Sequence, residues 1–187
     1  MGKNLLLKIS LSILIVILIT ISLIWFIAEK SNSYSEPNEA LLAIDKDLLL
    51  YPAYKRNGNA LFFFIKDKNH LGATYVKKGL FGWKSGMLTY SPMDHKRNYE
   101  KLNGYQGHSD NLIYGLIKIK DGDEKYIKID ENNANLLSLE MLPSYIVEEY
   151  QLEDIYIWYF ESDTALEVGE IKLMNKNTDE VIDTIDL

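Results

Sequence analysis

The stretch Asn57–Lys78, NGNALFFFIKDKNHLGATYVKK, contains a strong strand signal and decides the fold class of this chain. Its apolar run at 61–65 is short and has turn residues on both sides, which is typical of a strand buried on both faces. The polar turn at 67–69 and the run at 72–78 then predict an antiparallel hairpin. We therefore expect a sheet that is covered on both faces.

The segment before this hairpin predicts one short amphipathic helix, over residues 36–48. Ser35 suits the N-cap, and Glu36 and Pro37 suit the first turn. Apolar residues then recur at helical spacing, at Ala40, Leu41, Ile44 and Leu48. We expect this helix to pack on the sheet that follows it.

The segment after the hairpin is rich in further strand signals. A third strand is expected at 87–90, and a strongly buried strand is expected at 155–161, IYIWYFE. The turn Asp121-Gly122-Asp123 predicts a hairpin between strands at 112–120 and 125–129. A turn with a short helix is expected at 132–142, and a closing hairpin at 171–174 and 181–185.

Strands therefore follow one another without intervening long helices, which disfavours a parallel doubly wound sheet. We predict a β-dominated α+β fold, with one short helix followed by mainly antiparallel strands and hairpins. The polar stretch Ser91–Asp110 predicts a long loop. One lobe and two small lobes that meet at 91–110 both remain open.

The N-terminal run Ile9–Ala28, ISLSILIVILITISLIWFIA, contains no charged residue. Twenty helical residues extend about 30 Å, the thickness of the hydrocarbon core of a bilayer. We predict a transmembrane signal-anchor helix at 9–28, after a cytoplasmic N-terminus at 1–8. A polar spacer at 29–35 and an extracytoplasmic β-rich domain at 36–187 complete the predicted organisation.

The orientation follows from the charges beside this run. Lys3 and Lys8 precede it without an acidic residue, and positive charge is retained on the cytoplasmic side. We thus expect a single-pass protein of the cell membrane with its C-terminal domain outside. A signal peptide cleaved after Ser33 and a core helix of a soluble domain are the alternatives.

Composition excludes some classes of partner. All 27 acidic residues follow residue 28, where 18 of the 20 bases also lie, so this part has a formal charge of −9. Such a charge repels the phosphates of nucleic acids, and we expect no nucleic-acid partner. The chain contains no cysteine, so hydrophobic burial by 13 tyrosines, six phenylalanines and other apolar residues must stabilise it without disulfides.

No motif predicts catalytic residues, a cofactor or a metal site. The three histidines lack the spacing of metal ligands. The stretch from Asp130 resembles the start of a calcium loop, but it lacks the glycine and the glutamate that such a loop requires. His108-Ser109-Asp110 contains the residue types of a catalytic triad, although triad members usually come from separate elements.

Two segments remain as candidate interaction surfaces, the Gly79–Trp83 turn and the 91–110 loop. Their proposed residues are Gly82, Trp83, Asp94, His95 and His108.

The runs TYVKKGLFGW at 74–83 and IYIWYF at 155–160 resemble a group of uncharacterised membrane-anchored proteins of low-GC, spore-forming Gram-positive bacteria. The turn Gly82-Trp83-Lys84 is the most specific part of this resemblance. At the last hairpin, Asn175-Lys176-Asn177 replaces the Asp and Gly of that group. The resemblance implies an extracytoplasmic β-rich domain and no known activity.

Two classes of function are consistent with these features. The first is a non-enzymatic domain that binds, senses or supports an unknown envelope protein or ligand, with residues 9–28 in the lipid bilayer. The alternative is a cell-envelope enzyme that acts on wall polymer or lipid headgroups, with Asp94 or Glu100 as the base.

Overall fold

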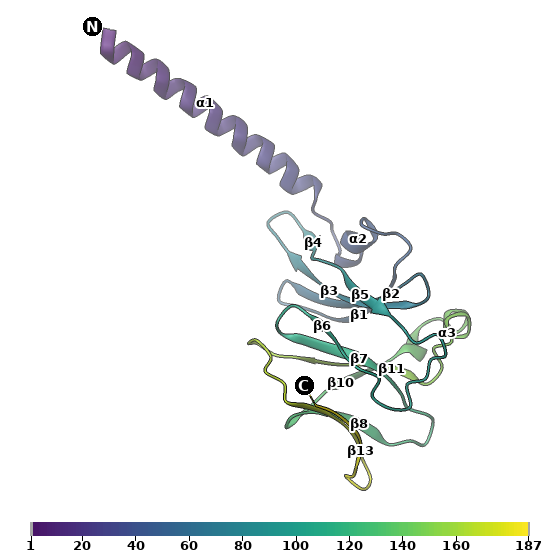
Figure 1. Ribbon diagram of the computed structural model, residues 1–187. Coiled ribbons are helices and arrows are strands. Elements are labelled where there is room, and N and C mark those ends of the chain that lie inside the picture. Colours follow the sequence, from purple (N-terminus) through teal and green to yellow (C-terminus); the bar gives the residue numbers. More distant parts are fainter. Residues whose placement is uncertain (1, 187) are drawn as a thin grey trace.

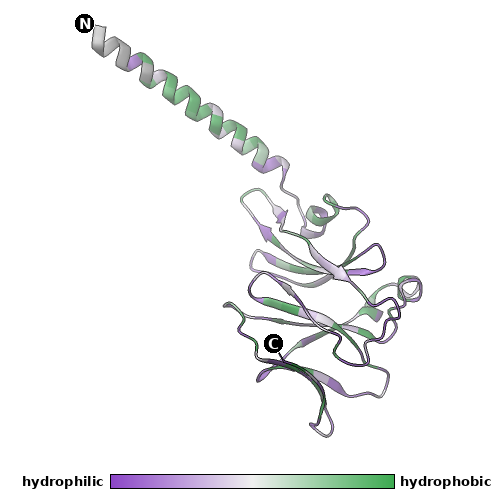
Figure 2. Cartoon of the chain, in the orientation of Figure 1, coloured by the Kyte–Doolittle hydropathy of each residue, from purple (hydrophilic) through white to green (hydrophobic). Residues whose placement is uncertain are grey.

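The computed structural model describes residues 2–186 and begins with the long helix α1, Gly2–Ser31. Its segment Leu11–Ser31 has a mean hydropathy of 2.9, and none of this segment is buried against the rest of the chain. Figure 2 shows the helix projecting from the domain, with apolar residues along most of its coloured length. The chain therefore has one N-terminal helix that is long and apolar enough to cross a membrane, a description that a signal sequence also meets. The alternative of a buried core helix is wrong.

Three antiparallel sheets follow α1. Sheet A has five strands, in which β3 pairs with β2 on one side and with both β4 and β5 on the other. The strands of sheet A are β1 Leu49–Arg56, β2 Asn59–Lys66, β3 His70–Lys78, β4 Trp83–Ser85 and β5 Thr89–Pro92.

Sheets B and C have four strands each. Sheet B has the order β10-β11-β7-β6, and sheet C has the order β13-β12-β8-β9. The strands of sheet B are β6 Gln106–His108, β7 Leu112–Lys118, β10 Asn135–Ser138 and β11 Ile155–Glu161. Those of sheet C are β8 Lys125–Ile129, β9 Asn132–Asn133, β12 Glu170–Asn175 and β13 Val181–Asp186. The predicted β-dominated α+β fold is confirmed.

The sheets are stacked, with sheet B between sheets A and C (Figure 1). Alternate residues of β7 enter two cores, with Tyr114 in the core shared with sheet A and Ile113 in the core shared with sheet C. In β11, Ile157 and Trp158 divide in the same way. This placement explains why the two central strands of sheet B, β7 and β11, are nearly continuous apolar runs rather than alternating ones.

Sheet A is also covered on both faces, as its sequence predicts. One face of β2 contributes Phe63 to the core shared with sheet B. The opposite face contributes Phe62 to a smaller core under helix α2, Pro37–Leu42, whose Ala40 and Leu41 are buried. The core between sheets A and B combines residues from before and after the segment 91–110.

The predicted hairpin at Asp121-Gly122-Asp123 is wrong. The chain does turn there, but β7 belongs to sheet B and β8 to sheet C, so the two strands do not pair. The reason is the number of buried faces: β7 is buried on both faces, whereas in β8 only Ile127 and Ile129, which share one face, are buried. Turn-forming residues such as Asp-Gly-Asp predict that the chain reverses, but the pattern of buried residues determines which strand pairs with which.

Helix α2 is shorter than the predicted helix at 36–48. The Glu39 carboxylate accepts the backbone N–H groups of Ser35 and Glu36 and thereby caps the helix start. Beyond residue 43 the chain bends, and Asp45 pairs with Lys66 at the end of β2, with a distance of 2.8 Å between Nζ and Oδ2. This ion pair connects the segment after the helix to the end of β2.

The remaining expectations have mixed outcomes. The hairpins β2–β3 and β12–β13 and the buried strand β11 are confirmed. The expected third strand at 87–90 is displaced to Thr89–Pro92. The expected turn and helix at 132–142 contain the strand β10 and a single 3-10 turn, η1, Leu139–Met141. Helix α3, Ser144–Tyr150, had no sequence prediction.

Most of the stretch 91–110 lies outside strands and helices, as expected. Residues 93–105, which we call the strap, connect β5 of sheet A to β6 of sheet B. The Arg97 guanidinium holds the strap in place by donating to the carbonyl oxygens of Asp94 and Lys68 and to Asn69 Oδ1, each at 2.8 Å. Its Nε also donates to the Tyr150 carbonyl oxygen, at 3.2 Å.

Candidate functional site

The five residues proposed from sequence lie in three separate places. Two of these residues, Gly82 and Trp83, lie where the spacer contacts sheet A. Tyr34 and Trp83 exchange backbone hydrogen bonds of 2.7 and 2.9 Å. A Cβ atom at Gly82 would lie 2.4 Å from the Tyr34 carbonyl oxygen, so only glycine allows this close approach. The Trp83 side chain is only 5% exposed and packs under α2. This tryptophan therefore stabilises the fold and does not form an open contact surface.

Asp94 and His95 lie in the strap. The Asp94 carboxylate accepts the backbone N–H groups of Lys96 and Asn98, and these hydrogen bonds lower its pKa. Asp94 lines a small hollow of about 220 Å³, while His95 is exposed. The other proposed base, Glu100, pairs with Lys120, which lowers its pKa as well. A lowered pKa weakens a carboxylate as a general base.

His108, at the end of β6, is buried beside a hollow between sheets A and B. Its Nδ1 lies 2.6 Å from Thr89 Oγ1, and its ring centroid lies 5.5 Å from that of Tyr75. Burial lowers the pKa of His108, because the charged imidazolium loses solvation. The hollow has a volume of about 370 Å³. It is lined by Tyr75, Lys77, His108, Ser109 and residues between Lys84 and Thr89.

A larger hollow, of about 540 Å³, shares Tyr75, Lys77 and Ser109 with the hollow beside His108. We call the two together the strand-end groove. In the larger hollow, the wall from sheet A comes from the β1–β2 turn and the end of β3, and the wall from sheet B comes from the β6–β7 turn and the end of β11. Loops and strand ends on a rigid sheet scaffold are where binding residues most often lie.

The centre of the larger hollow is a carboxylate held by two phenols. Glu161 Oε1 accepts hydrogen bonds from Tyr54 Oη at 2.8 Å and from Tyr75 Oη at 2.7 Å. Burial, and secondarily these bonds to a carboxylate, raise the pKa of both tyrosines. Both phenols thus remain protonated donors at neutral pH, and they fix the orientation of Glu161.

Charges of both signs surround this carboxylate. Arg56 and Lys77 line the hollow together with Glu161 and Asp163. The Arg56 guanidinium lies over the ring of Tyr54, 4.8 Å from its centroid. Within residues 2–186, none of these four charged side chains forms an ion pair with another side chain. The groove therefore offers cationic and anionic groups to a bound molecule.

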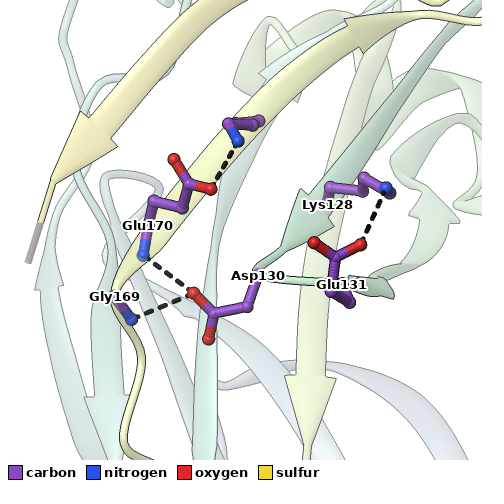
Figure 3. A network of polar contacts seen from close by, with 6 residues as sticks. Lys128, Asp130, Glu131, Gly169 and Glu170 are labelled. Atoms are coloured by element: carbon purple, nitrogen blue, oxygen red, sulfur yellow. Dashed lines mark hydrogen bonds and ion pairs between the residues drawn. The ribbon is translucent and has the colours of Figure 1, made fainter.

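No group of three or more potential metal-ligating side chains occurs within residues 2–186. Asp130, at the start of the sequence that resembles a calcium loop, has a structural role instead. Figure 3 shows its Oδ1 accepting the backbone N–H groups of Gly169 and Glu170, at 3.1 and 3.0 Å. These bonds fix the approach of the chain to β12.

Sequence reasoning proposed His108 but missed the residues around Glu161. Tyr54, Tyr75 and Glu161 come from three strands, up to 107 positions apart, so no local motif connects them. The one signal was positional: Glu161 is the charged residue that ends the apolar run IYIWYF. Comparisons of the chain with protein-family models, with curated proteins and with solved structures find no match.

Proposed function

We propose that this chain is a single-pass membrane protein whose domain outside the cytoplasm binds a polar ligand in the strand-end groove, as a non-enzymatic sensing or accessory domain. The apolar helix α1 and the lysines before it support the membrane location and the orientation. The resemblance to membrane-anchored proteins of Gram-positive bacteria favours a cell envelope as the compartment.

The observation that supports the binding role is a set of four charged side chains in the groove that form no ion pair within residues 2–186. Arg56 and Lys77 suit a carboxylate or phosphate of the ligand, while Glu161 and Asp163 suit an ammonium group. The hydrogen bonds from two tyrosines hold Glu161 in place before a ligand arrives. Such preorganisation lowers the entropic cost of binding. The groove therefore fits a molecule with both an acidic and a basic group, such as a short peptide with free ends.

The ligand class is tested by titrating the isotope-labelled full-length protein in detergent with the zwitterionic dipeptide Ala-Ala. We expect amide shifts that saturate and that cluster at residues 54–59, 75–77, 109–111 and 161–163. The capped dipeptide N-acetyl-Ala-Ala-amide has the same backbone without the charges and should cause no such shifts. Equal shifts with both peptides, or shifts elsewhere, would contradict the proposal.

A matched pair of variants tests the residues. Glu161→Gln removes the central negative charge but keeps a similar shape, and we expect it to weaken dipeptide binding by about tenfold or more. Glu153→Gln removes an equivalent charge from an exposed position outside the groove and should leave binding unchanged. The orientation of the membrane helix is tested separately, with a C-terminal reporter that is active only outside the cytoplasm.

A further inference from the structure

The turn between β3 and β4, Gly79–Gly82, lies beside the C-terminal end of α1 (Figure 1). The rings of Phe26 and Phe81 meet edge to face, with a distance of 4.7 Å between their centroids. One turn of helix further on, Glu29 Oε1 lies 2.5 Å from Lys84 Nζ. Together with the backbone pairing of Tyr34 and Trp83, these contacts attach the domain to the end of α1 at three successive positions along the chain, residues 26, 29 and 34.

These contacts determine the depth of the turn. Phe26 belongs to the last turn of the apolar run and follows Trp25, and tryptophan is enriched at the boundary between acyl chains and headgroups. Phe81, in contact with Phe26, must lie at nearly the same depth. Its neighbour Leu80 is 75% exposed and packs against no core within the described part of the chain.

The charges near the turn fit the same location. Lys77 and Lys78, immediately before it, are exposed, and so is Lys30 at the end of α1. Lysines beside an apolar tip interact favourably with headgroup phosphates while the apolar side chains enter the acyl region. An exposed leucine alone would need no explanation. An exposed leucine does need an explanation when it lies beside the end of an apolar helix and close to several lysines.

We propose that the Gly79–Gly82 turn is a second membrane contact of this protein, with Leu80 inserted among the lipids. This inference rests on the proposed membrane location of α1. It also orients the groove, because Lys77 and Lys84 line the hollow beside His108 and lie at the same corner of sheet A. The strand-end groove would then open close to the headgroups and be oriented by two contacts rather than by one flexible anchor.

The absence of cysteine in the natural sequence allows a direct test with single labels. Leu80→Cys, labelled with the environment-sensitive fluorophore NBD, reports the turn. Met141→Cys is the matched control, because Met141 is 80% exposed and lies on η1, away from this corner. Val16→Cys, within the apolar helix, reports whether α1 is inserted. The full-length variants are reconstituted into vesicles of phosphatidylcholine and phosphatidylglycerol, with and without lipids that carry a doxyl quencher, placed at a shallow acyl position for residues 80 and 141 and near the bilayer centre for residue 16.

We expect a blue-shifted emission at position 80 and a loss of about half of it to the quencher, because the turn lies at the interface. Position 141 should show neither effect. Quenching at position 16 without quenching at position 80 would overturn the inference while leaving the anchor intact, as when a protein partner covers Leu80 instead of lipid. Absence of quenching at position 16 would overturn the membrane anchor itself and this inference with it.

Discussion

Gly115 on β7 lies directly opposite Trp158 on β11, and a Cβ atom at Gly115 would stand 2.7 Å from the indole ring. Trp158 is fully buried between sheets B and C. The indole of Trp158 therefore occupies the space that a side chain at Gly115 would need, between the two central strands of sheet B.

The substitution Gly115→Ala should lower the free energy of unfolding by about 1–3 kcal/mol, because the added methyl group forces the indole out of its position. Urea unfolding of the full-length protein in detergent, followed by tryptophan fluorescence, measures this loss. Gly107→Ala is the control, since its Cβ would approach no atom more closely than 3.9 Å. An equal loss in both variants would show that backbone freedom, rather than the indole contact, requires glycine.

Arg97→Lys should lower the free energy of unfolding by about 1–3 kcal/mol, the usual cost of losing hydrogen bonds from a charged donor. A lysine ammonium cannot reproduce the planar fork that reaches four acceptors in three segments. Thermal unfolding by circular dichroism measures the change. Arg56→Lys, at the other arginine, should change stability by less than about 0.5 kcal/mol. A stable Arg97→Lys variant would mean that buried residues of the strap hold it without the guanidinium.

Stability should fall on the alkaline side. Burial raises the pKa of Tyr114 from its ordinary value near 10 to about 12. The folded state then keeps a proton that the unfolded state loses, so the stabilisation is complete below pH 10 and disappears as the pH rises toward 12. Urea unfolding at pH 9 and pH 11 should show this decline, and Tyr114→Phe should reduce it. Tyr145→Phe, at a residue that is 66% exposed, should leave the decline unchanged.

On the acid side, His108 should contribute the opposite dependence. Burial lowers its pKa below the ordinary value of 6.5, so the unfolded state binds a proton that the folded state excludes. The contribution of this residue is complete above pH 6.5 and is lost as the pH falls through the lowered pKa. The difference between melting temperatures at pH 7.5 and pH 5.5 should shrink in His108→Gln. An unchanged difference in His108→Gln, or an equal change in the exposed control His95→Gln, would assign the acid sensitivity to other groups.

The candidate site was only partly accessible to sequence reasoning. His108 was proposed because it lies in a long polar loop, and the structure does place it beside the strand-end groove. Trp83 was proposed for an interaction surface, yet it is buried under α2, because an aromatic residue next to a turn has the same sequence appearance on either face of a sheet. The pair formed by Tyr54 and Glu161 depends on which strand ends meet, and this is a property of the stacking.

The sequence by itself determined the elements whose signals are local. The uncharged run of α1, the apolar run of β2 with its hairpin to β3, and the run IYIWYF of β11 follow from hydrophobic length and period alone. Only the tertiary structure decided that β7 and β8 join different sheets and that Glu161 meets Tyr54 and Tyr75. The physical reason is that turns and periodicity act between near neighbours. The choice of partner strand depends instead on how much apolar surface the whole stack buries.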